Sequence, residues 1–177
     1  MDSIMNFAKS LLGVKYVLWK GESFYENLYP FYVKQIPSLE YIKKNGINCA
    51  GFINLLRQKS GLTIPGKEHK YKGGTDSWYK YFEENNKLKT FDYRENYPIG
   101  TLFGRKYRGI NDQGHLAVLY EIDKDGLWLN NKIIHSYYEK KNKGKVGITT
   151  LGYSHYSKEN GYYEYAVLPE DWLFEKK

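Results

Sequence analysis

Asn48-Cys49-Ala50-Gly51-Phe52 contains the single cysteine of the 177-residue chain. The apolar residues that follow recur at the i, i+3, i+4 spacing of an amphipathic helix: Phe52, Ile53, Leu55 and Leu56. Gly61 is expected to end this helix. Cys49 is therefore predicted in or near the first helical turn. There, free backbone N–H groups and the helix dipole favour a thiolate, the reactive form of cysteine. We interpret Cys49 as a candidate nucleophile; the alternative is a buried, inert cysteine.

Length and composition predict one domain over residues 1–177. A chain of this length buries about 70% of the surface that its unfolded form exposes, so it needs no disulfide or metal to fold. Residues 1–7 lack the basic and apolar regions of a signal peptide, and no run of about 18 apolar residues predicts a membrane span. We expect a cytoplasmic protein, and an injected or virus-associated protein would have the same features.

The charge balance is basic, with 27 Lys and Arg against 20 Asp and Glu, a net charge of +7, and 18% of the residues are aromatic. This combination is compatible with an anionic or polymeric partner. The densest basic run, residues 140–145, is expected to be a solvated loop rather than a nucleic-acid-binding patch. Nucleic acid is therefore not the partner that we favour.

The first half of the chain is predicted to be mainly helical. Apolar spacing predicts a helix from about Ile4 to Leu12, capped by Asp2 or Ser3 and ended by Gly13, and a shorter helix over residues 75–84 with Thr75 or Asp76 at its N-cap. Residues 22–47 are rich in aromatics and contain two prolines, so we expect a long loop that forms one wall of a cleft beside Cys49 and that could gate it.

The second half is predicted to be β-structure. Runs of β-branched and aromatic residues predict strands that are separated by turns, with residues 123–126 joining the second and third strands as a hairpin. The predicted strands are residues 99–103, 114–122, 127–129, 132–137, 146–151 and 162–168. Helices followed by consecutive antiparallel strands indicate an α+β fold.

Two histidines are expected at the same end of neighbouring strands of this sheet. His115 opens one strand and His135 closes another, so the hairpin would bring their rings into contact. A helix N-terminus packed across that end would bring Cys49 within hydrogen-bond reach of His115, with His135 orienting the His115 ring. A zinc site that also uses His155 is an alternative, but no C-x-x-C or H-x-x-x-H spacing supports it, and we expect no cofactor.

Five short motifs follow one another along the chain: Tyr16; Asn48-Cys49-Ala50-Gly51-Phe52; Pro98-Ile99-Gly100-Thr101-Leu102-Phe103; Gly114-His115-Leu116-Ala117-Val118-Leu119-Tyr120; and Ile133-Ile134-His135-Ser136. In this order they resemble the NlpC-type branch of the papain-like cysteine peptidases over nearly the whole chain. The resemblance implies a nucleophile-bearing helix packed on an antiparallel sheet. It implies a catalytic triad of Cys49 as nucleophile, His115 as base and His135 as orienter. It also implies that Tyr16 lines the cleft and that the Cys49 backbone N–H contacts the oxyanion.

The chain departs from this family beside the nucleophile. Members that cut cell-wall stem peptides usually have Asp before the cysteine and Ser after it, where they recognise the free amine of the substrate; here Asn48 and Ala50 hold those positions. Neither side chain can pair with an ammonium group as Asp does, and Ala has no hydroxyl. The usual Asp of the third motif is also replaced, by Thr101. Another amide or isopeptide is thus as good a candidate substrate as a peptidoglycan-like one.

The sequence therefore predicts a cysteine hydrolase, a peptidase or amidase that cleaves an amide bond through an acyl-enzyme on Cys49. We expect catalysis to start from a Cys49 thiolate and a His115 imidazolium. Two alternatives stay open. One is a catalytically silent binding module of the same fold, and the other is a thioesterase or acyltransferase that uses Cys49.

Overall fold

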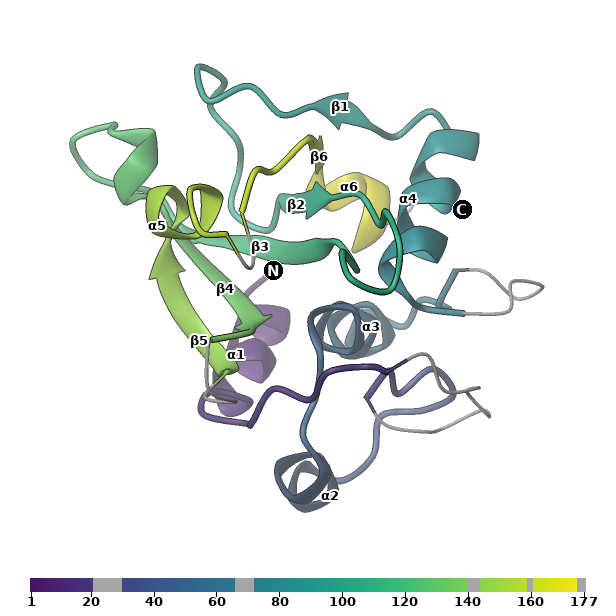
Figure 1. Cartoon of the computed structure of the whole chain (residues 1–177). Helices are drawn as coiled ribbons and strands as arrows, with labels where there is room; N and C mark the ends of the chain where they lie inside the picture. Colours follow the sequence, from purple (N-terminus) through teal and green to yellow (C-terminus); the bar gives the residue numbers. More distant parts are fainter. Residues whose placement is uncertain (21–29, 66–71, 140–143, 159–160, 175–177) are drawn as a thin grey trace.

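The computed structural model describes residues 1–20, 30–65, 72–139, 144–158 and 161–174 (Figure 1). Most of the helices precede the sheet along the chain, as an α+β fold requires. The helices are α1 (Asp2–Ser10), α2 (Leu39–Asn45), α3 (Cys49–Lys59), α4 (Thr75–Glu84), α5 (Leu151–His155) and α6 (Pro169–Trp172), and a 3₁₀ helix, η1, spans Trp128–Asn130. The strands are β1 (Lys89–Thr90), β2 (Leu102–Arg105), β3 (His115–Glu121), β4 (Lys132–Tyr137), β5 (Lys145–Thr150) and β6 (Tyr165–Val167).

These strands form one sheet in the order β1-β6-β2-β3-β4-β5, and every neighbouring pair is antiparallel. The β3–β4 hairpin pairs Val118 with Ile134 and Leu119 with Ile133. In that register His115 and His135 are diagonal neighbours on adjacent strands, a separation that long side chains can bridge. The predicted pairing of the His115 strand with the His135 strand is confirmed, whereas the hairpin expected to join residues 114–122 directly to a strand at 127–129 through the turn at 123–126 is wrong, because 128–130 form a 3₁₀ helix.

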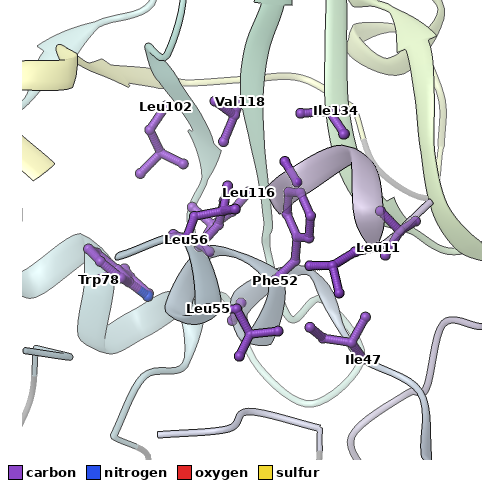
Figure 2. Packing of buried hydrophobic residues seen from close by; sticks show 14 of the residues in the cluster. Leu11, Ile47, Phe52, Leu55, Leu56, Trp78, Leu102, Leu116, Val118 and Ile134 are labelled. Atoms are coloured by element: carbon purple, nitrogen blue, oxygen red, sulfur yellow. The ribbon is translucent and has the colours of Figure 1, made fainter. Parts of the chain in front are cut away.

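Helix α3 packs on one face of the sheet, with α1 and α4 beside it (Figure 1). The cluster between them joins side chains from all of these elements (Figure 2): Leu11, Phe52, Leu55, Leu56, Trp78, Leu102, Leu116, Val118 and Ile134. Each of these side chains is almost fully excluded from water. The expected papain-like arrangement, a helix that begins at the cysteine and packs on an antiparallel sheet, is therefore present.

A second apolar cluster covers the opposite face of the sheet. Strand residues that alternate with those facing α3, such as Phe103 and Ala117, meet the aromatic side chains of Tyr97 and Tyr163. Burial on both faces makes β2 and β3 largely apolar, and it fixes which strand residue meets which helix.

Local contacts fix the point where α3 begins. The Asn48 side-chain oxygen accepts a hydrogen bond from the Gly51 backbone N–H at 2.7 Å, so Asn48 caps the helix and Cys49 is its first residue. Gly51 is needed for a different reason. A Cβ at this position would lie 1.9 Å from the carbonyl oxygen of Pro30, so only glycine lets that segment pass the first turn.

Several sequence expectations are corrected. Part of the expected long loop is helix α2, with the Ser38 hydroxyl accepting from the Tyr41 backbone N–H, and residues 21–29 lie outside the described part of the chain. Residues 128–130 form η1 instead of a strand, because they turn the chain between β3 and β4. Strand β1 was not predicted, and it pairs over two residues only.

The expected N-caps of the first and fourth helices are also wrong. Met1 precedes α1 and Gly74 precedes α4, and neither makes a side-chain capping bond. The expected loop at residues 140–145 lies partly outside the described residues, and Lys145 begins β5. None of the helices in the described residues has the length and apolarity that crossing a membrane requires.

Candidate active site

Cys49 lies at the N-terminus of α3 and is 5% exposed. Burial raises the pKa of its thiol to about 11, and this effect outweighs the groups that lower the pKa: hydrogen bonds from the backbone N–H groups of Leu116 and Ala50, and the positive charge of Arg105. The bond from Leu116 places the sulfur against the start of β3, next to His115 in the sequence.

The two histidines are in direct contact. His115 Nε2 lies 2.8 Å from His135 Nδ1, and the two rings are 2% and 1% exposed. Burial lowers the pKa of His135 to about 3; burial, together with the neighbouring His135 and Arg105, holds the pKa of His115 well below its usual range. Both rings are therefore neutral at pH 7, and one of them donates to the other.

A threonine that the sequence did not single out completes this chain of side chains. Thr149 lies on β5, and its Oγ1 is 2.9 Å from His135 Nε2. Both ring nitrogens of His135 are thus engaged, one by His115 and one by Thr149. The contact depends on the β4–β5 register, in which His135 pairs with Gly147, and such a register cannot be read from a sequence.

The ionic pair expected from the sequence is not what the structure favours. Helix α3 does present its N-terminus to the sulfur, but burial disfavours the Cys49 thiolate more than the neighbouring groups favour it, and burial, His135 and Arg105 all disfavour the His115 imidazolium. A direct bond between Cys49 and His115 is also not among the hydrogen bonds that the described residues form: the sulfur accepts from backbone N–H groups, and His115 contacts His135. The free site therefore contains a thiol beside neutral imidazoles.

Arg105 was also missed by the sequence analysis. It ends β2 opposite His115 in the β2–β3 register, and it pairs with Asp112 at 2.8 Å. Its charge lowers the pKa of both Cys49 and His115, so it favours thiolate and disfavours imidazolium. A charged residue at the end of the otherwise apolar segment 102–105 is the sequence signal that points to it.

Tyr165 of β6 places a third unpredicted group near the site. Its ring lies over Gly104, where a Cβ would be 2.0 Å from it. The hydroxyl is buried and has no hydrogen-bond partner among the described residues. Burial, and then the nearby Cys49, raise the pKa of Tyr165 far above its ordinary value, so this hydroxyl is a neutral donor.

Two adjoining cavities meet at these residues. The first is lined by Cys49 together with the three other residues expected at the cleft, Tyr16, Asn48 and Ala50. The second is lined by His115, and it shares Tyr16 and Gln113 with the first. The three sequence-predicted cleft residues therefore line the same cavity as Cys49, and Tyr16 also lines the cavity at His115.

His155, the fourth residue of the zinc alternative, lies elsewhere. It ends α5, and its Nδ1 accepts from the Tyr163 backbone N–H at 3.2 Å. Within the described ranges, no three His, Cys, Asp or Glu side chains form a group that could hold a metal ion.

Among known proteins, the chain shows a distant structural similarity. A scan against protein-family models and a search of the curated proteins found no match. One similar solved structure is a Staphylococcus aureus protein described as similar to a lipoprotein of the NLP/P60 family, with 15% sequence identity and a TM-score of 0.49. The match covers 94% of this chain and 40% of the S. aureus chain, so this chain spans less than half of that protein's length.

Proposed function

We propose that the protein is a cysteine hydrolase that cleaves an amide bond through an acyl-enzyme on Cys49. The observation that carries this proposal is the His115–His135 contact of 2.8 Å, beside a cysteine held at a helix N-terminus. A nucleophile, a base and a group that orients the base are the components that covalent catalysis requires.

One arrangement of protons gives His115 the role of base. If His115 Nε2–H donates to His135 Nδ1, then His135 Nε2–H donates to Thr149 Oγ1, and His115 Nδ1 carries a lone pair. That lone pair would accept the Cys49 proton. The roles proposed are thus nucleophile for Cys49, base for His115, and orienter for His135, itself held by Thr149.

The proposed cycle begins with a neutral pair, in agreement with the pKa shifts. As the sulfur attacks the carbonyl carbon, the Cys49 proton moves to His115 Nδ1, and the carbonyl electron pair moves to oxygen. The N–H of Cys49, at the start of α3, would donate to this oxyanion, because the first N–H groups of a helix have no intrahelical partner. The C–N bond then breaks, and His115 protonates the leaving amine. Water, deprotonated by His115, hydrolyses the thioester and restores the thiol.

An activity screen tests the proposal. The wild type and Cys49→Ala would be compared on simple peptide amides, ubiquitin-like isopeptides and peptidoglycan fragments. Cys49-dependent release of an amine from any of these substrates supports the hydrolase. Cleavage of wall fragments would mean that Asn48 and Ala50 do not prevent recognition of a wall peptide. Hydrolysis of thioesters without amide cleavage would favour the thioesterase alternative.

The raised pKa of Cys49 is the observation that favours a different class, the catalytically silent binding module. Iodoacetamide labelling separates the two. A hydrolase is labelled at Cys49 at pH 7 at a rate that falls in His115→Ala, because the base has been removed. A silent module is labelled slowly, and equally slowly in both proteins.

A further inference from the structure

The cavity at Cys49 is lined by four aromatic side chains among its eleven lining residues. Four rings form its walls, those of Tyr16, Trp19, Phe31 and Tyr107, and Ala50 adds a methyl group beside the sulfur. Trp19 and Phe31 are buried, and their ring centroids are 6.3 Å apart. Such walls match the flat, apolar surface of another aromatic group.

The carboxylate at this cavity and the side-chain oxygen of Asn48 are already engaged. The Asn48 side-chain oxygen is bound to the Gly51 N–H at 2.7 Å, and the Asp76 carboxylate is paired with Lys80 at 2.8 Å. Asp76 is the one charged side chain among the described residues that line the cavity. The cavity therefore presents no unpaired charge to a bound group, and a charged group would lose water without gaining an ionic partner.

Hydrogen bonds between loops hold the cavity in shape before anything binds. Gln113 Nε2 donates to the Trp19 carbonyl at 2.7 Å, and the Thr75 hydroxyl donates to the Gln113 carbonyl at 2.5 Å. Three segments that are far apart in the sequence are thereby tied together. A pre-formed pocket of this kind discriminates between side chains by size and polarity.

The second cavity has a different character. Its lining includes the charged side chains of Arg105, Asp112 and Lys158, together with His115. In the proposed cycle His115 protonates the leaving amine, whereas the acyl part stays attached to Cys49. The leaving part therefore lies on the polar side, and the acyl part lies beside the aromatic cavity.

From this asymmetry we infer that the aromatic cavity binds a large aromatic side chain on the acyl side of the scissile bond. The inference rests on the proposed function, because the reaction decides which side holds the acyl group. The substrates inferred are uncharged acyl donors with a Phe-like group next to the cleaved amide.

A series of N-acetyl-X-aminomethylcoumarin substrates tests the inference, with X as Phe, Ala, Glu or Lys. The kcat/KM for Phe is expected to exceed that for Ala by about tenfold or more, as contacts with an apolar pocket allow, and Glu and Lys should be slower than Ala. Equal rates for Phe and Ala, or a preference for Glu or Lys, overturn the inference.

Two further measurements separate this inference from the proposed function. Cys49-dependent hydrolysis of p-nitrophenyl acetate needs no aromatic cavity, so its presence without a Phe preference leaves the hydrolase standing and removes the inference. Calorimetric binding of N-acetyl-Phe-amide and N-acetyl-Ala-amide to Cys49→Ala tests the cavity without turnover. Tighter binding of the Phe ligand supports the inference, and equal binding contradicts it.

Tyr107→Ala provides the matched variant, because this ring lines the cavity and is only half-buried. It should lower the Phe-to-Ala ratio of kcat/KM severalfold. Tyr93→Ala is the control, since Tyr93 is exposed and does not line the cavity. If Tyr107→Ala does not fold, Asn48→Asp keeps the capping oxygen and adds a negative charge, which should shift preference from Phe toward Lys. An unchanged ratio in a folded variant counts against the inference.

Discussion

His115 and His135 lie on neighbouring strands with Nε2 of the first 2.8 Å from Nδ1 of the second, and both rings are buried. Twenty residues separate them in the chain, and the β3–β4 hairpin makes them diagonal neighbours. Because His135 also contacts Thr149, a line of three side chains runs from β3 across β4 to β5. In the proposed function this line holds the base in place beside Cys49.

Removal of the base should have the largest effect on turnover after removal of Cys49. His115→Ala is expected to lower kcat by about 10²–10⁴-fold, the contribution of a positioned general base. Circular dichroism would establish that the variant is folded. A His115→Ala protein that is folded and retains the wild-type kcat would show that another group is the base.

Thr149 is expected to act on the reaction through His135. Thr149→Val removes the hydroxyl at His135 Nε2 and keeps the side-chain shape, so kcat should fall about threefold to tenfold, as the loss of one hydrogen bond worth ~1 kcal/mol implies. Thr149→Ser keeps the hydroxyl and should keep most of the activity. The acid limb of the kcat/KM profile should also shift in the valine variant. Equal rates and identical pH profiles for Val and Ser variants would exclude this positioning role.

The pH dependence of activity follows from the lowered pKa of His115. A neutral imidazole is the active form of the base, so activity should persist below pH 6.5 and fall only where His115 becomes protonated in the folded protein. Rates of a Cys49-dependent substrate measured from pH 4 to pH 9 test this expectation. An acid limb with a midpoint above 6.5 would indicate a charged partner that stabilises the imidazolium.

The buried histidines should also make the protein sensitive to acid. The pKa of His135 in the folded protein is about 3, below its value in an unfolded chain, so the unfolded state binds more protons between those two pH values. The contribution of neutral His135 to the free energy of unfolding is complete above about pH 6.5 and is lost as the pH falls. At pH 5 the loss is about 2 kcal/mol for a fully buried histidine. Urea unfolding at pH 7.5 and pH 5.0 measures the difference. His135→Asn should reduce it, and an unchanged difference in that variant would contradict the shift.

Gly51 is expected to tolerate no side chain. Gly51→Ala would force a Cβ against the Pro30 carbonyl oxygen, and overpacking of this kind destabilises a protein by about 1–3 kcal/mol. Gly126→Ala is the control, because a Cβ there meets nothing within 4 Å and only the positive φ of 74° is strained. Thermal unfolding should show a larger loss for Gly51→Ala. If the two variants lose the same stability, the close approach of Pro30 is not what requires glycine.

Strong local signals made α3 and the β3–β4 hairpin predictable from the sequence. Asn48 and Gly61 bracket an apolar helical repeat, and a polar segment that includes the turn at residues 123–126 lies between the two apolar strands β3 and β4. Helix α2 has only seven residues inside a segment rich in aromatics and prolines, so its helical signal was weak. Secondary structure was therefore predictable where periodicity was long and its ends were marked.

The electrostatic state of the site could not be predicted in the same way. A helix N-terminus is visible in the sequence, and it led to the expectation of a thiolate at Cys49. The depth of burial, which raises the pKa of Cys49 and lowers that of His115, depends on tertiary packing. The contact of Thr149 with His135 and the position of Arg105 opposite His115 depend on strand register. Such contacts between distant segments decide the chemistry of the site.

The most direct test of the central claim is intact-mass spectrometry of the protein mixed with p-nitrophenyl acetate and quenched within the first turnover. The account predicts one acetyl group per wild-type chain, mapped to Cys49 by peptide digestion, a much slower formation of this adduct in His115→Ala, and its absence in Cys49→Ala. Acetylation of other residues only, or formation at the same rate in wild type and His115→Ala, would contradict the account.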